Sequence, residues 1–337
     1  MPAHVPVAPE RVLELLGPAI ESQDHPVYVD ATIGLGGHAW LIAEAFPQVR
    51  IIGLDRDPAA VKAAQQRLAN HAERTTVVHA NYDQLHQVCD DLGVAAADAV
   101  LFDLGVSSPQ LDLDERGFAY SRDTALDMRM DTTQELTAAR ILATYPRAEL
   151  VRILARYGEE RYAGRIATAI VNARADQPIE RSAQLVELIR QAIPAPARRT
   201  GGNPAKRTFQ ALRVEVNGEL AALEAALPQA IDLLRVGGRI VVMSYQSLED
   251  AIAKRVLQDA ATSAAPAGLP VEPEATKPYL RLLTRGAEPA GPAEQARNPR
   301  SAPLRLRAAV KTRPSRPRPS VQSAKTRATR SRQGVSR

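Results

Sequence analysis

Short apolar segments typical of strands alternate with helical segments over the first hundred residues, and this rhythm constrains the fold more than any other feature. Strands are expected at residues 27–30, 50–55, 75–79 and 98–103. These segments are almost continuously apolar, as strands are when helices cover both faces of a sheet. Strands that alternate with helices predict βαβ units and a parallel sheet. We therefore expect an α/β protein.

The rhythm breaks after residue 103, because the next convincing strand lies at residues 238–244. Most of the interval has helical periodicity, with helices expected at residues 137–143, 149–157, 159–173 and 182–192, and from Thr208 onward. We therefore expect an all-helical domain inserted at residues 126–209. The discontinuous remainder, residues 1–125 and 210–310, is expected to form the sheet domain, with a returning helix at 218–234 and last strands near 279–283 and 303–307.

Positive charge is concentrated at the C-terminal end of the chain. The whole chain has a net charge of +5, from 43 Lys and Arg against 38 Asp and Glu. Eleven of the 43 lie in residues 301–337, which hold no acid, so residues 1–300 carry 32 basic and 38 acidic residues, a net of −6. Residues 311–337 are rich in Pro, Ser and Arg and too poor in apolar residues to offset their ordering entropy, which predicts a disordered basic tail. Such a tail is either a phosphate-seeking arm or a solubilising extension.

The composition of the chain indicates the cellular compartment in which we expect it. Hydrophobic residues make up 45% of the chain, enough for a real core, in which we also expect Trp40 and Cys89. Cys89 is the single cysteine, so one chain cannot form a disulfide, as is usual in a reducing compartment. The N-terminus lacks the basic and apolar regions of a signal peptide, and no segment approaches the ~18 apolar residues of a membrane span. We therefore expect a cytoplasmic protein.

The loop Gly34-Leu-Gly36-Gly37-His38 follows the first strand and opens a helix. Glycines let the backbone turn sharply and approach a ligand, and the start of a helix offers free N–H groups. Asp55 ends the second strand, where a carboxylate can accept hydrogen bonds from ribose hydroxyls. The alternative is a tight turn followed by a solvent-facing acid with no ligand. In a βαβ context we favour a nucleoside-binding site.

The glycine pattern alone does not choose the cofactor, because Gly34, Gly36 and Ala39 also satisfy a loose dinucleotide fingerprint. Two carboxylates favour S-adenosyl-L-methionine: Asp30, which could orient a cationic methionine end, and Asp103, which ends the fourth strand at the edge where such folds place substrates. Residues 233–242 also resemble the segment before the fifth strand in this class of methyltransferase. An NAD-dependent oxidoreductase remains the alternative, although no partner for hydride transfer is evident.

Four longer segments extend this resemblance from a class of enzymes to one family. They are residues 103–112 (Asp-Leu-Gly-Val-Ser-Ser-Pro-Gln-Leu-Asp), residues 116–131, residues 157–161 (Tyr-Gly-Glu-Glu-Arg) and residues 207–217. In this order they resemble the MraW/RsmH family of ribosomal small-subunit RNA cytosine-N4 methyltransferases. The resemblance runs from about His4 to Arg305 and leaves out the basic tail.

The resemblance implies a Rossmann-like, S-adenosyl-L-methionine-dependent methyltransferase sheet with an inserted all-helical substrate-binding domain. It also implies that the target is a cytidine of the decoding region of 16S rRNA, within the small ribosomal subunit of a bacterial cytoplasm. The positions that match the cofactor contacts of the family are Gly36, Gly37, His38, Asp55, Tyr82, Asp103 and Gln110.

The chain departs from the family pattern at one of these positions and in one further segment. Tyr82 falls where the family usually has Phe, and its ring could still stack on adenine. Residues 244–250 read Ser-Tyr-Gln-Ser-Leu-Glu-Asp, where the family commonly has Ser-Phe-His-Ser-Leu-Glu-Asp. Gln246 cannot take up a proton, so we assign it no catalytic part.

The chemistry implied by the resemblance sets what the residues must do. The N4 amine of cytosine is a poor nucleophile because its lone pair is delocalised into the ring, whereas a sulfonium methyl group is already activated, so no metal is expected. The enzyme must align amine, methyl carbon and sulfur, and must accept a hydrogen bond from the amine. Asp103, or a carbonyl in residues 104–108, is the candidate catalytic acceptor; alternatively, Asp103 only binds the cofactor.

The sequence also contains a candidate contact with the RNA substrate. The Gly-rich loop at residues 198–207 holds Arg198, Arg199, Lys206 and Arg207, which makes it the candidate RNA contact. A third class of function, a non-catalytic rRNA-binding assembly protein that retains this fold, stays open on the sequence alone.

Overall fold

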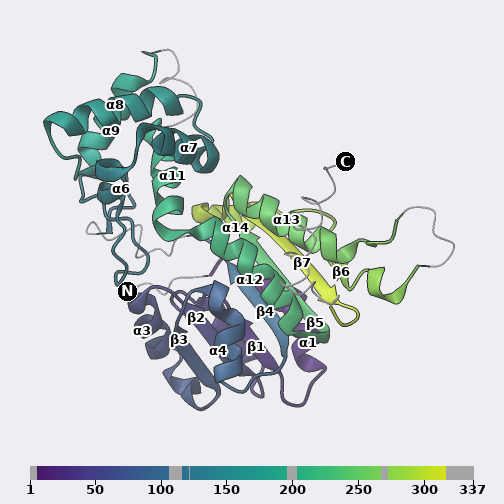
Figure 1. Ribbon diagram of the computed structural model, residues 1–337. Helices are drawn as coiled ribbons and strands as arrows, with labels where there is room; N and C mark the ends of the chain where they lie inside the picture. The colour runs from purple at the N-terminus through teal and green to yellow at the C-terminus, as the bar shows by residue number, and fades with distance from the viewer. Residues whose placement is uncertain (1–5, 106–115, 121, 196–202, 267–271, 316–337) are drawn as a thin grey trace.

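The computed structural model describes residues 6–105, 116–120, 122–195, 203–266 and 272–315. Seven strands form one sheet in the order β3-β2-β1-β4-β5-β7-β6 (Figure 1). They are β1 (Val27–Asp30), β2 (Arg50–Asp55), β3 (Thr75–His79), β4 (Ala97–Asp103), β5 (Leu234–Ser244), β6 (Leu280–Leu282) and β7 (Arg305–Lys311). Strands β1 to β5 are parallel, while β7 runs antiparallel to both β5 and β6. This topology confirms the expected α/β, Rossmann-like sheet.

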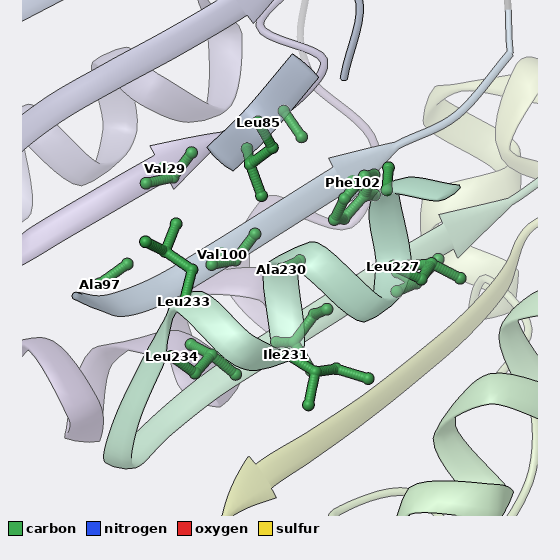
Figure 2. Close-up of a cluster of buried hydrophobic side chains, with 14 of the residues drawn as sticks. Val29, Leu85, Ala97, Val100, Phe102, Leu227, Ala230, Ile231, Leu233 and Leu234 are labelled. Atoms are coloured by element: carbon green, nitrogen blue, oxygen red, sulfur yellow. The ribbon is translucent and has the colours of Figure 1, made fainter. Parts of the chain in front are cut away.

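Helices cover both faces of the sheet, which explains the apolar runs of the strands. One face packs against α1 (Pro9–Glu21), α2 (Gly37–Ala45) and α3 (Pro58–Arg67), and the other against α4 (Leu85–Asp91), α12 (Glu219–Leu233) and α13 (Ser247–Ala261). Successive side chains of a strand point to opposite faces. In β4, Val100 and Phe102 face α12, as Figure 2 shows, whereas Ala99 and Leu101 face the α1 side.

A second core belongs to the helices that lie between β4 and β5 in the sequence. They are α6 (Ala138–Thr144), α7 (Arg147–Gly158), α8 (Ala163–Asp176), α9 (Ser182–Ala192) and α11 (Ala205–Asn217). The buried residues of this core run from Phe118 to Val216, and we call them and their helices the helical unit. In Figure 1 the helical unit stands apart from the sheet, and α11 leads back to it. The boundary expected at residue 209 falls within α11, because Ala211, Leu212 and Val216 still pack into this core.

Hydrogen bonds hold a loop at residues 127–131 in place between the helices and the sheet. The Asn217 side chain, 3% exposed, donates through Nδ2 to the Met128 carbonyl and accepts the Met130 N–H at Oδ1, both at 2.8 Å. Arg56 Nη1 in turn donates to the Asn217 carbonyl at 2.6 Å. The end of α11 is therefore bonded both to this loop and to the segment that follows β2.

The C-terminal end of the sheet corrects one expectation. Lys311, where the disordered tail was expected to begin, is the last residue of β7 and is 5% exposed. Its Nζ donates to the carbonyl oxygens of Ile231 and Asp232 at 2.8 and 2.9 Å. Lys311 is ordered because β7 pairs with β5 on one side and β6 on the other, and because its ammonium binds the carbonyl end of α12. The sequence beyond Ser315 lies outside the described residues.

Two single-residue expectations have opposite outcomes. Cys89 is buried in α4, as expected. Trp40 is 36% exposed, with the Arg67 guanidinium 5.7 Å from its ring centroid, so its expected place in the core is wrong. Within the described ranges no helix is both long and apolar enough to cross a membrane.

Candidate active site

A cavity of about 680 Å³ lies at the carboxyl edge of the parallel strands. Its walls come from the ends of β1, β2 and β4, from α11, from Pro6 and Val7, and from residues 298–300 and 303. Open α/β sheets bind ligands at this edge, and the volume suits a small organic molecule. The fold therefore brings strand ends, the helical unit, the first described residues and the segment before β7 to one site.

The turn after β1 forms the floor of the cavity. Gly34 and Gly36 have φ values of 53° and 74°, which favour glycine. Gly34, Gly37 and His38 line the cavity, whereas Gly36 does not. A Cβ on Gly36 would lie 3.3 Å from the Ala64 backbone in α3. Gly36 therefore allows the turn to pack against α3, and its expected contact with the cofactor stays a prediction.

Asp55 ends β2 with its carboxylate held at the cavity wall. Its Oδ2 accepts the Gly34 N–H at 2.9 Å and its Oδ1 accepts the Asp57 N–H at 2.8 Å. Burial raises the pKa of Asp55 to about 6, partly offset by these two backbone donors. Each carboxylate oxygen has a second lone pair, so the fixed group can still accept hydrogen bonds from a diol.

Asp103 ends β4 and lies within reach of side chains from two other elements. Its Oδ1 accepts the Tyr245 hydroxyl at 2.8 Å, and its Oδ2 lies 3.5 Å from His38 Nε2. The His38 side chain is 6% exposed, and its Nε2 is buried without a hydrogen-bond partner among the described residues. A buried polar atom in this state indicates a ligand or water that completes its bonding.

Asp30 lies behind this group at the end of β1. Its side chain is 1% exposed and accepts the Tyr28 hydroxyl at 2.9 Å and the Thr32 N–H at 3.2 Å. Burial raises the pKa of Asp30 to about 6. The sheet therefore gathers Asp30, Asp55 and Asp103 at one edge, as the sequence predicted from their positions at strand ends.

Tyr82 supplies an aromatic wall. Its ring meets that of Phe102 edge to face, with centroids 6.0 Å apart, and its hydroxyl donates to the Glu219 carbonyl at 3.0 Å. Burial raises the pKa of this phenol, which stays protonated at neutral pH. The ring is thus anchored at both ends beside the cavity, where it can present a face to a planar ligand.

Sequence reasoning missed a cluster of charged residues in the cavity wall. The Arg213 guanidinium binds the Glu219 carboxylate through two contacts of 2.9 Å. Glu249 accepts the N–H groups of Tyr245 and Gln246 at 2.9 and 3.1 Å, and burial raises its pKa to about 7. Arg213 lies in a segment that carries the family resemblance, which is the one sequence signal that pointed to this wall.

The helical unit contributes an outer, aromatic wall. Tyr120 and Phe209 line the cavity and meet edge to face, with centroids 5.9 Å apart. Exposed Lys206 also lines it. Arg198 and Arg199 of the expected RNA-binding loop lie outside the described residues, as does Gln110, the last expected cofactor contact. Among the residues that the structure does describe, no group of three His, Cys, Asp or Glu side chains could hold a metal ion.

The sheet order, the glycine turn and the acid at the end of β2 define a nucleoside-binding enzyme of the Rossmann-like class. The model of the MraW methylase family matches residues 1–312, and the chain belongs to this family. It is thus a methyltransferase that uses S-adenosyl-L-methionine, which removes the alternatives of an NAD-dependent oxidoreductase and of a non-catalytic assembly protein.

Curated relatives agree with this assignment. The chain is 60% identical over 313 residues to the ribosomal RNA small subunit methyltransferase H of Frankia alni, which covers 93% of this chain and 96% of that protein. It is 58% identical over 312 residues to the protein of the same name from Thermobifida fusca, covering 93% and 94%. The solved structure of an rRNA methylase from Streptococcus thermophilus covers 91% of this chain and 95% of its own, at 14% identity and a TM-score of 0.39.

Proposed function

We propose that this protein methylates the N4 amine of a cytidine in the decoding region of 16S rRNA, acting on the small ribosomal subunit in the cytoplasm. The observation that carries the proposal is the position of Asp103. Its carboxylate lines the cavity at the strand edge, together with the glycine turn and the aromatic pair of the helical unit. An acceptor in that position can meet an amine that enters from the helical side.

The residues at the strand edge fit S-adenosyl-L-methionine. Asp55 is fixed to accept the ribose hydroxyls, and the Tyr82 ring offers the adenine a stacking surface. Asp30 and Asp103 give the floor negative charge that complements a sulfonium and an ammonium group. When bound, this cofactor supplies a methyl group that is already activated for transfer.

The chain's own contribution to the chemistry is alignment and proton acceptance. Holding two reacting groups in line can lower a barrier by about 7–11 kcal/mol in favourable cases. Asp103 accepts a hydrogen bond that strengthens as the amine becomes positively charged, which stabilises the transition state more than the ground state. We therefore propose Asp103 as the catalytic acceptor.

The helical unit is proposed to bind the RNA, with residues 126–209 as the substrate-binding domain. A base must leave its stack to reach a buried pocket. Unstacked bases are commonly held against aromatic side chains, and Tyr120 with Phe209 supplies such a wall. Lys206 at the same wall is suited to a neighbouring phosphate.

One experiment tests the proposed function. Protein is incubated with labelled S-adenosyl-L-methionine and undermethylated small ribosomal subunits, and the labelled nucleoside is mapped. Label on N4 of a decoding-region cytidine is the expected result, and label on any other atom contradicts the proposal. Asp103→Asn is expected to lose most of its turnover; if it keeps normal turnover and normal cofactor affinity, Asp103 is neither acceptor nor cofactor ligand.

A further inference from the structure

We propose that Tyr245 is a positioning residue: its hydroxyl holds one oxygen of the Asp103 carboxylate, so that the other oxygen faces the reacting amine. This inference rests on the proposed function of Asp103 as the acceptor, and it concerns a hydroxyl that this chain carries at a position where the family commonly has Phe.

The contacts of Asp103 divide the work between its two oxygens. Oδ1 accepts the Tyr245 hydroxyl at 2.8 Å, an ordinary hydrogen-bond length between two oxygens. Oδ2 lies 3.5 Å from His38 Nε2, too far for a full hydrogen bond, and the Asp103 side chain is 26% exposed. The backbone of Asp103 is also fixed, since its N–H donates to Thr32 Oγ1 at 2.6 Å. Oδ2 is consequently the oxygen left for a substrate.

Tyr245 is itself held so that its hydroxyl has little freedom. Its backbone N–H donates to Glu249 Oε2 at 2.9 Å, at the junction between β5 and α13. Its ring packs against the core on the α1 side of the sheet, and a Cβ on Gly105 would lie 3.5 Å from it. Burial raises the pKa of Tyr245, with Asp103, Glu249 and Glu294 adding to the effect, so the phenol is a donor at neutral pH.

The transfer step balances with this arrangement. The amine nitrogen forms a bond to the methyl carbon, and the bond from that carbon to sulfur breaks with its electron pair remaining on sulfur. The nitrogen then loses one proton, which passes to Asp103 Oδ2. Tyr245 keeps its own proton throughout and acts through Asp103 rather than on the substrate.

Without the hydroxyl, the carboxylate is free to rotate toward His38 Nε2, away from the amine. Small misplacements of a catalytic group cost about tenfold to a hundredfold in rate. The deletion leaves the ring, the backbone bond to Glu249 and the walls that contact the cofactor in place. The loss is therefore expected in turnover and not in binding.

The test compares Tyr245→Phe with Ser263→Ala, which also removes a hydroxyl that donates to a carboxylate. The Ser263 hydroxyl donates to Glu272, and both residues lie outside the cavity wall and outside the helical unit. For each variant, kcat and KM are measured with undermethylated small subunits, and the cofactor Kd is measured by calorimetry. We expect Tyr245→Phe to lower kcat about tenfold with KM and Kd within about twofold, and Ser263→Ala to match the wild type.

Two results overturn the role of Tyr245: an unchanged kcat, or a cofactor Kd that rises by the same factor as kcat falls, which makes the contact one of cofactor binding. The assay counts all methyl transfer, so the comparison decides the role of Tyr245 whichever atom is methylated. Mapping the label in the wild type decides the proposed function separately.

Discussion

Arg116 Nη2 donates to the Asp57 carboxylate at 2.8 Å, and the same nitrogen donates to the carbonyl oxygens of Arg129 and Met130. Asp57 also caps α3, because its Oδ1 accepts the Ala59 N–H at 3.0 Å. The two side chains are 15% and 4% exposed. This ion pair joins the sheet to the loop that enters the helical unit, away from bulk water.

Arg116→Ala removes the cation from a buried carboxylate and a donor from two carbonyl groups. Breaking a buried pair in this way typically lowers the free energy of unfolding by about 3–5 kcal/mol. The matched control is Arg140→Ala, whose pair with Glu135 has side chains that are 56% and 87% exposed. That change is expected to cost less than about 1 kcal/mol. Urea unfolding measures both, and equal losses would refute the structural importance of the Arg116 pair.

Gly158 is the last residue of α7, where this helix crosses α11. A Cβ at this position would lie 2.5 Å from the Arg207 carbonyl oxygen and 3.2 Å from Ala211 Cβ. Gly158→Ala must therefore push the two helices apart, with an expected loss of about 1–3 kcal/mol in unfolding free energy. Gly286→Ala, where a Cβ meets nothing within 4 Å, should stay within about 0.5 kcal/mol of the wild type. Thermal or urea unfolding that ranks them the other way contradicts this account of the crossing.

Two variants of Tyr82 separate the contributions of ring stacking and hydrogen bonding to cofactor binding. Tyr82→Ala removes the ring, and loss of base–aromatic stacking costs about 1–3 kcal/mol, so cofactor Kd is expected to rise tenfold or more. Tyr82→Phe removes only the hydroxyl that donates to Glu219 and should bind nearly as well as the wild type. Calorimetry with S-adenosyl-L-methionine measures both, and equal weakening by the two variants would show that the hydroxyl, not the ring, matters.

Glu249 should make the cofactor-free protein less stable as pH rises. Burial raises its pKa from 4.5 to about 7, so between those values the folded protein holds a proton that the unfolded chain has lost. The contribution to the free energy of unfolding is therefore highest below about pH 4.5 and is lost as the pH rises to about 7. Asp30 and Asp55, with pKa values raised to about 6, act in the same direction.

Glu249→Gln removes this dependence while keeping an oxygen that accepts the two backbone N–H groups. One pKa unit corresponds to about 1.4 kcal/mol, so the variant should gain more than about 1 kcal/mol relative to wild type between pH 4.5 and 7.5. Glu135→Gln, with a side chain 87% exposed, serves as the control. Urea unfolding measures the free energy of unfolding at both pH values. An equal change between them for wild type and Glu249→Gln would contradict the raised pKa of Glu249.

Local sequence patterns predicted the bounds of the strands well. They did not predict where contacts between distant residues change the structure. The strands at residues 27–30, 50–55 and 75–79 have the expected bounds, because each apolar run is bounded by turn residues. The helix expected from residue 159 begins at Ala163, since Glu159 has a φ of 50° and its carboxylate accepts the Ser247 hydroxyl from α13. The helical periodicity of residues 159–173 signals neither the left-handed backbone at Glu159 nor its contact with a distant helix.

The residues of the site also divide into those that the sequence predicted and those that it did not. Asp30, Asp55 and Asp103 were predictable because parallel strands bring their carboxyl ends to one edge. Tyr245 meets Asp103 from 142 residues away in the sequence, and no periodicity signals such a contact. Gly36 has a packing role that its position in the glycine loop did not suggest, because α3 fills the space beside it.

The first described residues and the segment before β7 line the same cavity: Pro6 and Val7 line it together with residues 298–300 and 303, and Arg11 binds Glu288 through two contacts of 2.9 Å. A nascent polypeptide therefore cannot finish this wall until residue 303 has been synthesised. An interrupted translation product that stops after the helical unit would carry the glycine turn and Asp55 without the enclosure around them. Full enclosure of the cavity thus depends on a segment that is synthesised after β1 to β5 and the helical unit.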